Sequence, residues 1–151
     1  MQNSNIKADK FQEFLTANQI TCFGVQEMND AVHTVIFRTN LEVGGQQLPV
    51  MFVTDDTLHA PLQVRVVAAA VQGPNTLHVL NYVNELNRTY KSFKYFISED
   101  NALILDVCLT AVPEQFEPQL VSLALDVILR NLAEEYPVIM RKIWAEEAVQ
   151  N

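Results

Sequence analysis

Basic residues and glycine are scarce in this sequence, and both scarcities exclude classes of function. The 151 residues include 10 lysines and arginines against 18 aspartates and glutamates, for a formal net charge of −8 at pH 7. Nucleic-acid binding depends on clustered basic side chains that neutralise phosphates, so we expect no nucleic-acid partner. With four glycines, the chain has no glycine-rich loop followed by a helix and a lysine. The usual cradle for nucleotide phosphates is therefore excluded.

Long apolar runs and catalytic motifs are missing as well. No run approaches the roughly 18 residues of a membrane-spanning helix, and residues 1–10 lack the apolar segment of a signal peptide. We therefore expect a cytoplasmic protein without a membrane partner. No serine has a recognisable arrangement of His and Asp, and neither Cys22 nor Cys108 lies in a catalytic-thiol signature. Both cysteines have apolar neighbours, which predicts buried, unpaired thiols. The protein is expected to be no enzyme and to hold no cofactor.

The pattern that is present centres on a helix followed by a β-hairpin. Asn75 or Thr76 can supply the N-cap oxygen of the helix. Apolar residues then recur at steps of three or four and predict one buried face, made of Leu77, Leu80, Val83, Leu86 and Tyr90. From residue 93 the period changes to two, in two runs separated by the polar residues 99–101. This change predicts an antiparallel hairpin over residues 93–110.

The first half of the chain predicts an amphipathic helix over residues 7–19 and then antiparallel strands. The first strands are expected over residues 22–28 and 33–43, with His33 as a hydrogen-bonded histidine on the apolar face. Gly44 and Gly45 suit a two-residue turn, after which a strand resumes at Leu48. Residues 62–71 are apolar on both faces, which predicts a strand covered on two sides.

A second long helix, expected over residues 114–136, is apolar around about 240° of its circumference and so needs cover from two directions. One possible second cover is another copy of the chain. The other is the chain's own end, if Pro137 breaks the helix and the following residues fold back. The homodimer is the preferred reading, and its predicted interface is Leu125, Ile128, Leu129 and Leu132.

Two polar groups are candidate sites. Asp55, Asp56 and His59 share a loop and could hold a divalent ion, although their spacing matches no established ligand motif and an exposed polar loop is favoured. Asn81, Asn84 and Asn87 form a polar ladder on the middle helix. Hydrogen bonds to neighbouring strands or loops are favoured there over contacts with a ligand.

Residues 84–87 (Asn-Glu-Leu-Asn), the alternating run 93–98, the turn 99–101 and the run 103–109 together resemble the YbjN family of bacterial proteins, often described as putative sensory transduction regulators. The resemblance extends over most of residues 77–136. It implies a fold like that of the type III secretion chaperones, which are small, acidic and dimeric. A role in secretion itself is not implied.

The residues and the resemblance together predict one α+β domain over residues 1–151, with a core over about 7–148 and the element order α-β-β-β-β-α-β-β-α. The first functional hypothesis is a non-enzymatic interaction module, a chaperone-like or regulatory adaptor that acts as a homodimer and binds a segment of a client protein. The second is a sensory regulator that binds a small ligand near Tyr82, Asn84 and Asn87. The third, least favoured, is a metal enzyme using the Asp55, Asp56 and His59 loop.

Overall fold

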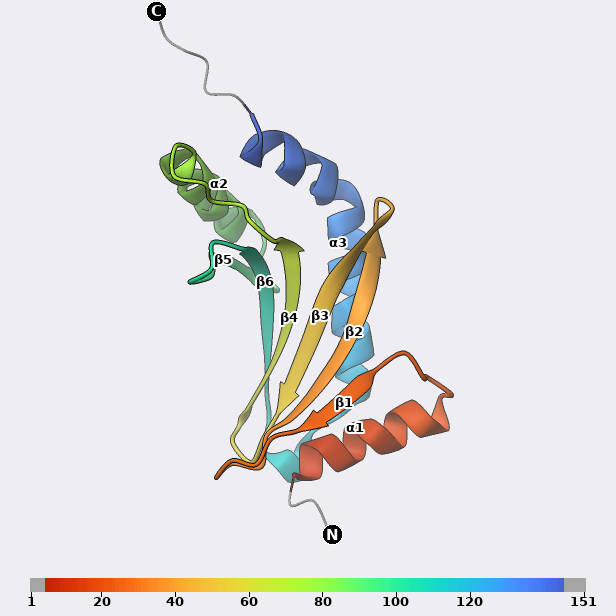
Figure 1. Ribbon diagram of the computed structural model, residues 1–151. Coiled ribbons are helices and arrows are strands. Elements are labelled where there is room, and N and C mark those ends of the chain that lie inside the picture. The colour runs from red at the N-terminus through yellow and green to blue at the C-terminus, as the bar shows by residue number, and fades with distance from the viewer. Residues whose placement is uncertain (1–4, 146–151) are drawn as a thin grey trace, which may run out of the picture.

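The computed structural model describes residues 5–145, and its elements follow the order expected from the sequence (Figure 1). The α+β class and the order α-β-β-β-β-α-β-β-α are confirmed. Residues 146–148 of the expected core lie outside the described part. The elements are α1 (Ile6–Ala17), β1 (Gly24–Glu27), β2 (Val35–Val43), β3 (Gln46–Thr54), β4 (His59–Val67), α2 (Thr76–Thr89), β5 (Lys94–Ile97), β6 (Leu103–Thr110), the short 3₁₀ helix η1 (Pro113–Gln115) and α3 (Gln119–Ile143).

The strands form one antiparallel sheet in the order β1-β2-β3-β4-β6-β5. Figure 1 shows α1 and α3 on the far side of the sheet, whereas no helix crosses the near side. Burial alternates accordingly along β2, β3 and β4: Phe37, Phe52 and Leu62 are fully buried, whereas Arg38 is exposed and Gln63 is half-buried. The sheet therefore has an inner face under the helices and an outer face open to solvent.

Phenylalanine rings join α1 to the inner face. The Phe11 ring centroid lies 4.8 Å from that of Phe37 and 5.0 Å from that of Phe52, both edge-on, an arrangement that favours aromatic pairs. Phe116, which follows η1, stacks on Phe52 at 6.1 Å. Asn5 caps α1, because its Oδ1 accepts a hydrogen bond from the Ala8 amide at 2.9 Å.

Both predicted hairpins are confirmed. Gly44 and Gly45 have φ angles of 55° and 79° and join β2 to β3 by a two-residue turn. The polar turn between β5 and β6 has Asn101 at φ 66°, a conformation that asparagine tolerates better than most residues.

The pairing of β3 with β4 is much shorter than the strands themselves. It comprises three residue pairs, from Val50↔Val64 to Phe52↔Leu62, although each strand has nine residues. Pro49 lies just beyond one end of this ladder and Pro61 just beyond the other. A proline cannot donate a backbone hydrogen bond, so its place in a central strand requires an explanation.

The hydrogen-bonding pattern supplies that explanation. The pair that closes a two-residue hairpin, here Val43↔Gln46, is hydrogen-bonded, and bonded and non-bonded pairs alternate from there. Pro49 opposite Asn40 is consequently in a non-bonded pair with β2, and its nitrogen faces β4. The same alternation directs the nitrogen of Pro61 toward β3. Each proline thus occupies the next bonding position of the β3–β4 ladder and ends it, leaving a seam between the halves β1-β2-β3 and β4-β6-β5.

The predicted buried face of α2 is wrong in its phase. Val79, Tyr82, Val83 and Leu86 are buried, but Leu77 and Leu80 are 72% and 47% exposed. The helix lies at one end of the sheet, between β5 and the end of α3 (Figure 1). The face that it buries there is therefore rotated from the face predicted by the apolar spacing. Asn75 occupies the N-cap position, but its side chain makes no capping hydrogen bond to the first turn of the helix. Its side chain instead contacts the Gln72 amide and the Ala70 carbonyl.

The expectation that the strand over residues 62–71 is covered on two sides is also wrong. On β4, Leu62 and Val64 are buried on the inner face, whereas Pro61, Gln63 and Arg65 on the outer face are half-buried. The register of β4 against β6 shifts between Arg65 and Val67, and the strand ends there. The second apolar face that was expected for this strand falls largely on residues 68–71, which lie beyond the end of β4.

The last helix does not break at Pro137. α3 is continuous from Gln119 to Ile143, with Pro137 in its interior, and it bends over its final turns (Figure 1). Proline removes one helical hydrogen bond and commonly bends a helix without ending it. Beyond the bend Ile139 and Ile143 are buried, and Asn75 Nδ2 donates to the Ile143 carbonyl at 3.4 Å. The last turns of α3 thus contact the start of α2 as a continuation of the same helix, and not as a separate helix folded back.

Candidate functional site

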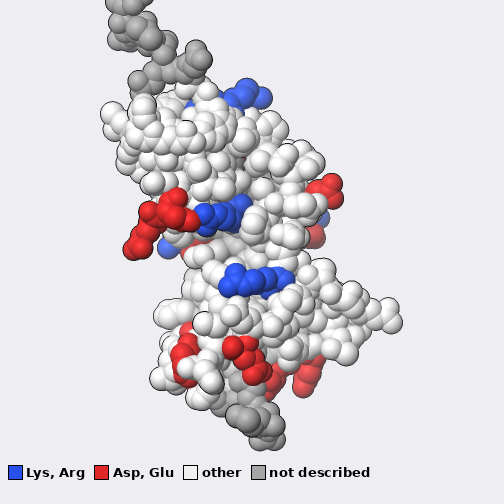
Figure 2. Space-filling model, viewed as in Figure 1, with Lys and Arg blue, Asp and Glu red and all other residues white. Residues whose placement is uncertain are grey.

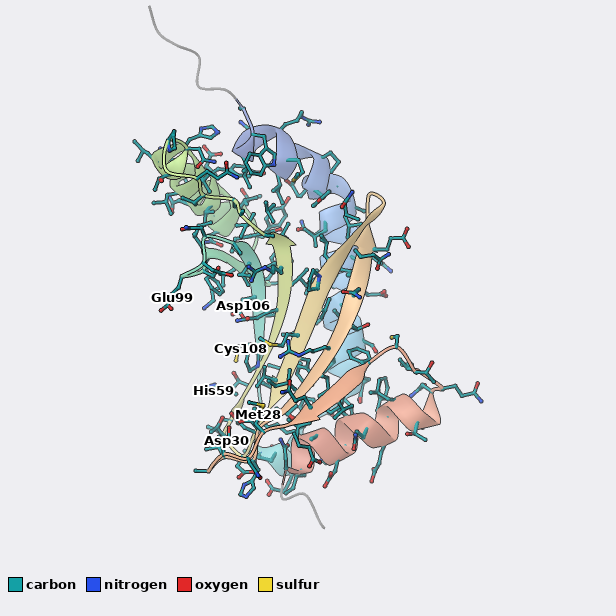
Figure 3. The ribbon with its side chains drawn as sticks, in the orientation of Figure 1. Met28, Asp30, His59, Glu99, Asp106 and Cys108 are labelled. Atoms are coloured by element: carbon teal, nitrogen blue, oxygen red, sulfur yellow. The ribbon has the colours of Figure 1, made fainter. Side chains whose placement is uncertain are left out.

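The loop considered as a metal site, for which an exposed polar loop was the favoured reading, does not bring its three candidate side chains together. The Asp55 carboxylate lies 3.6 Å from Lys7 Nζ, and Asp56 pairs with His33 at 2.5 Å. His59 is turned toward the outer face, where its Nδ1 lies 4.0 Å from Cys108 Sγ (Figure 3). Within residues 5–145, no group of three side chains could together hold a metal ion. Asp55, Asp56 and His59 therefore interact with three different neighbours.

A buried lysine holds this loop, which the sequence did not indicate. Lys7 of α1 has no exposed surface, and its Nζ donates to the carbonyls of Thr57 at 2.7 Å and His59 at 2.8 Å. Burial lowers the pKa of Lys7 because the charged form loses its hydration, and Asp55 partly opposes that shift. These contacts satisfy backbone acceptors, so Lys7 fixes the loop to α1.

Other single-residue expectations fail for local reasons. His33 lies before β2 with φ 54°, and its side chain is 51% exposed, so the prediction of a core histidine on a strand is wrong. Cys22 and Cys108 are unpaired as expected but exposed, because Cys22 precedes β1 and Cys108 points from β6 to the outer face. Apolar neighbours in the sequence therefore did not predict whether either cysteine is buried.

The three side chains on α2 that were considered as possible ligand contacts do not converge either. Asn87 Oδ1 accepts from the Tyr95 amide at 2.7 Å and Nδ2 donates to the Tyr95 carbonyl at 2.9 Å, which fulfils the expected hydrogen bonding to a strand. Asn84 is exposed. Tyr82 is 7% exposed, and its hydroxyl has no hydrogen-bond partner among residues 5–145. Burial, with the charge of Glu135 as a smaller cause, raises the pKa of Tyr82 to about 12.

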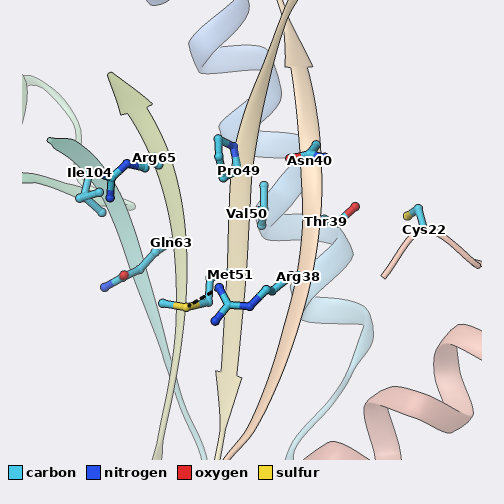
Figure 4. Close-up of a pocket in the computed structure, with 10 residues that line it drawn as sticks. All are labelled: Cys22, Arg38, Thr39, Asn40, Pro49, Val50, Met51, Gln63, Arg65 and Ile104. Atoms are coloured by element: carbon cyan, nitrogen blue, oxygen red, sulfur yellow. Dashed lines mark hydrogen bonds between the residues drawn. The ribbon is translucent and has the colours of Figure 1, made fainter. Parts of the chain in front are cut away.

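A hollow lies instead on the outer face, at the seam between β3 and β4. We call it the seam groove; it encloses about 390 Å³ (Figure 4). It opens where the ladder ends at Val50↔Val64 and the two strands separate. Its lining is Cys22, Arg38, Thr39, Asn40, Pro49, Val50, Met51, Gln63, Arg65 and Ile104.

The charges around the seam groove are unevenly compensated. Asp106 is held by Gln63 Nε2 at 3.1 Å and lies 3.6 Å from Lys94 Nζ, and Arg65 pairs with Asp100. Arg38 forms no ion pair within the described residues; its Nη1 instead contacts Met51 Sδ at 3.6 Å. Figure 2 shows basic side chains on both sides of the narrow waist of this face. The waist is thus locally basic on a chain whose net charge is negative.

A second exposed feature is an apolar stripe on α3, formed by Leu120, Leu123 and Val127, which are 40%, 60% and 42% exposed. We call it the α3 stripe. The interface predicted from the sequence lies on another side of the helix: Ile128 and Leu132 have no exposed surface, and Leu125 and Leu129 are partly buried. Ile128 and Leu132 pack in the chain's own core, so a partner could reach them only after α3 left the sheet.

Comparison with known proteins adds no relative: no family model, curated protein or solved structure matches this chain. Within residues 5–145, no helix is long and apolar enough to cross a membrane.

Proposed function

We propose that this chain is a non-enzymatic interaction module that works as a homodimer and binds a segment of a client protein on the outer face of its sheet. The observation that carries the proposal is the seam groove: a hollow with an apolar floor on a sheet face that no helix covers. Uncovered faces that mix apolar and basic side chains are a common setting for protein recognition. A chaperone-like or regulatory adaptor needs such a surface and no reactive group.

The homodimer is supported by the α3 stripe. Leu120, Leu123 and Val127 are spaced by three and four residues, which is the spacing of apolar residues in the interface between two packed helices. Because a two-fold interface pairs the same surface from each copy, one stripe can cover its counterpart. Leu77 and Leu80 of α2 and Trp144 are also exposed, but they lie toward the far end of α3. The resemblance to the YbjN family also implies a dimer.

Sedimentation velocity on the purified full chain tests the homodimer. We expect a dimer at about 50 μM. Leu123→Asp should yield folded monomer, because it places two like charges in the apolar interface between the two α3 helices. Ser122→Asp is the matched control, since Ser122 is exposed on the same turn and lies beside the stripe. The melting temperature should rise with protein concentration for the wild type and for Ser122→Asp, but not for Leu123→Asp.

Two outcomes would contradict this part of the proposal. A wild-type monomer at that concentration would remove the homodimer altogether. A dimer that survives Leu123→Asp but dissociates with Leu80→Asp would place the interface on α2, and not on the α3 stripe.

The alternative function is a sensory regulator that binds a small ligand, and one observation favours it. The buried Tyr82 hydroxyl lacks a hydrogen-bond partner among the described residues, and such a group can be satisfied by a ligand. A thermal-shift screen of metabolites tests this function. It predicts a rise in melting temperature with one chemical class, and loss of that rise in Tyr82→Phe.

A further inference from the structure

The two arginines of the seam groove stand on opposite sides of it. Arg38 of β2 is in register with Met51 of β3, which is in register with Gln63 of β4. Arg65 is two residues further along β4 and in register with Ile104 of β6. From the usual spacings of a sheet, the two arginine Cα atoms lie about 10 Å apart across the strands and about 7 Å apart along them. A ligand in the groove therefore has a guanidinium at each end of a diagonal.

Both guanidinium groups are available to an anion. Arg38 has no acidic partner among residues 5–145 and lies against the thioether of Met51. The partner of Arg65 is Asp100, whose side chain is 60% exposed, and exposed ion pairs of this kind contribute little free energy and exchange readily. Guanidinium groups bind carboxylates through two parallel hydrogen bonds, which adds specificity to the charge.

The floor between the arginines is apolar. Pro49 and Met51 of β3 supply it, and Ile104 of β6 extends the apolar surface beyond Arg65. The flexible methionine can adapt to different side chains. Pro49 also lacks the backbone donor that would let β3 close against β4, so the separation of the strands follows from the sequence. The groove thus combines charge at its two sides with an apolar surface along its length.

We propose that the seam groove binds an extended acidic segment of the client protein, with carboxylates on Arg38 and Arg65 and apolar side chains on the floor between them. In an extended chain, side chains alternate, and those two residues apart on one side are about 7 Å apart. The two arginine Cα atoms are about 12 Å apart on the diagonal, close to the roughly 13 Å between side chains four residues apart. The matching segment therefore has an acidic residue, an apolar residue two positions later and a second acidic residue two positions after that, all on the side that faces the groove. A small molecule fits less well, because the groove is open on its outer side and cannot enclose most of a ligand's surface. This inference rests on the proposed function, since it names the chemistry of the client.

Fluorescence anisotropy with a labelled nonapeptide of sequence Glu-Ser-Leu-Ser-Glu-Ser-Leu-Ser-Glu, called the glutamate–leucine peptide, tests the inference on the full chain. In the extended peptide its glutamates and leucines share one side, and the glutamine–leucine peptide has glutamine in place of each glutamate. We expect saturable binding that weakens as salt is raised, and weaker binding of the glutamine–leucine peptide of the same length. Arg38→Gln should raise Kd about fivefold, and the double change Arg38→Gln with Arg65→Gln about tenfold or more. Arg130→Gln is the control: its side chain on α3 is 83% exposed and its partner Asp126 is on the same helix, so Kd should change less than about twofold.

Circular dichroism establishes that each variant is folded, and the salt and glutamine–leucine measurements need no variant at all. The inference is overturned if the acidic peptide fails to bind at millimolar concentration, or if Arg130→Gln weakens it as much as Arg38→Gln. Equally tight binding of free succinate would overturn it in favour of a small-molecule site. Loss of dimerisation in Arg38→Gln would identify a second copy of the chain as the occupant. Sedimentation keeps the two proposals separate, because a monomer that still binds the peptide contradicts only the homodimer.

Discussion

Tyr82 and Tyr95 are both buried, but their hydroxyls differ in their hydrogen bonds. Tyr95 donates to Asn131 Oδ1 of α3 at 3.0 Å, whereas the Tyr82 hydroxyl has no partner among residues 5–145. An unmade hydrogen bond in a buried site costs more free energy than a made one contributes. Tyr82→Phe should therefore raise the free energy of unfolding by up to about 1 kcal/mol, whereas Tyr95→Phe should lower it by about 1 kcal/mol. Urea denaturation of the two variants measures both changes.

The same residue makes stability depend on alkaline pH. Burial raises the pKa of Tyr82 from its usual 10.0 to about 12, so the folded chain keeps a proton that the unfolded chain releases. Its contribution is complete below pH 10 and is lost as the pH rises toward 12. Tyr82→Phe should make the decline in stability over this range shallower. Equal urea midpoints for Tyr82→Phe and Tyr95→Phe would contradict the assigned hydrogen bonds.

The burial of Lys7 and the exposure of His33 could not be predicted from the sequence, because each depends on one specific local feature of the fold. A lysine near the start of a helix is ordinarily expected to be exposed to solvent. Lys7 is buried because its Nζ donates to two backbone carbonyls about 50 positions away in the sequence. His33 continued the alternation of β2, but its positive φ turns it out of the strand. Periodicity reports on repeated neighbours along an element and carries no information about a single contact with another element.

At the scale of elements, Asn87 joins α2 to an exposed sheet edge. β5 is the outermost strand on its side, and the Asn87 amide pairs with the backbone N–H and C=O of Tyr95 much as another strand would. Asn87→Ala removes both hydrogen bonds and should lower the free energy of unfolding by about 1–3 kcal/mol. The change is measured by urea denaturation.

Asn84→Ala is the matched control, because Asn84 is exposed on the same helix one turn earlier. It should leave stability within about 0.5 kcal/mol or raise it slightly, since alanine favours a helix more than asparagine does. Equal effects at both positions would show that the contact with Tyr95 contributes nothing beyond helix propensity.

How far the elements were predictable also follows from particular residues. The two hairpins were foreseen because their signals are local: paired glycines at 44 and 45, and a polar turn ending at Asn101. The face of α2 was not, because Leu77 and Leu80 fit the helical period as well as Val79 and Val83, and tertiary contacts decide between such phases. Pro137 was read as a break because local propensity opposes it, but packing of the residues after it keeps the helix intact. The seam groove was missed because it requires the register of four strands.

At the scale of the whole molecule, the sheet consists of two three-stranded halves that share a ladder of three residue pairs. Pro49 and Pro61 occupy the next bonding positions at its two ends. The inner face remains a single core across the seam, since Phe52 of β3 and Leu62 of β4 are both fully buried. The outer face is where the strands separate, and there the separation forms the groove. Two residues without a backbone donor thus link the local sequence to the one hollow proposed for binding.

Supplying the missing donor tests this relation. Pro49→Val introduces a backbone N–H directed at β4 and a residue that favours strands, so the ladder should lengthen past Val50↔Val64. We expect the new amide proton at position 49 to exchange slowly with solvent and the free energy of unfolding to rise by about 0.5–1.5 kcal/mol. Because a longer ladder narrows the seam groove, Kd for the glutamate–leucine peptide should rise as well. Pro74→Ala, in the exposed turn before α2, controls for the general effect of removing a proline. Rapid exchange at position 49 with unchanged peptide binding would mean that sheet twist, and not the proline, separates the strands.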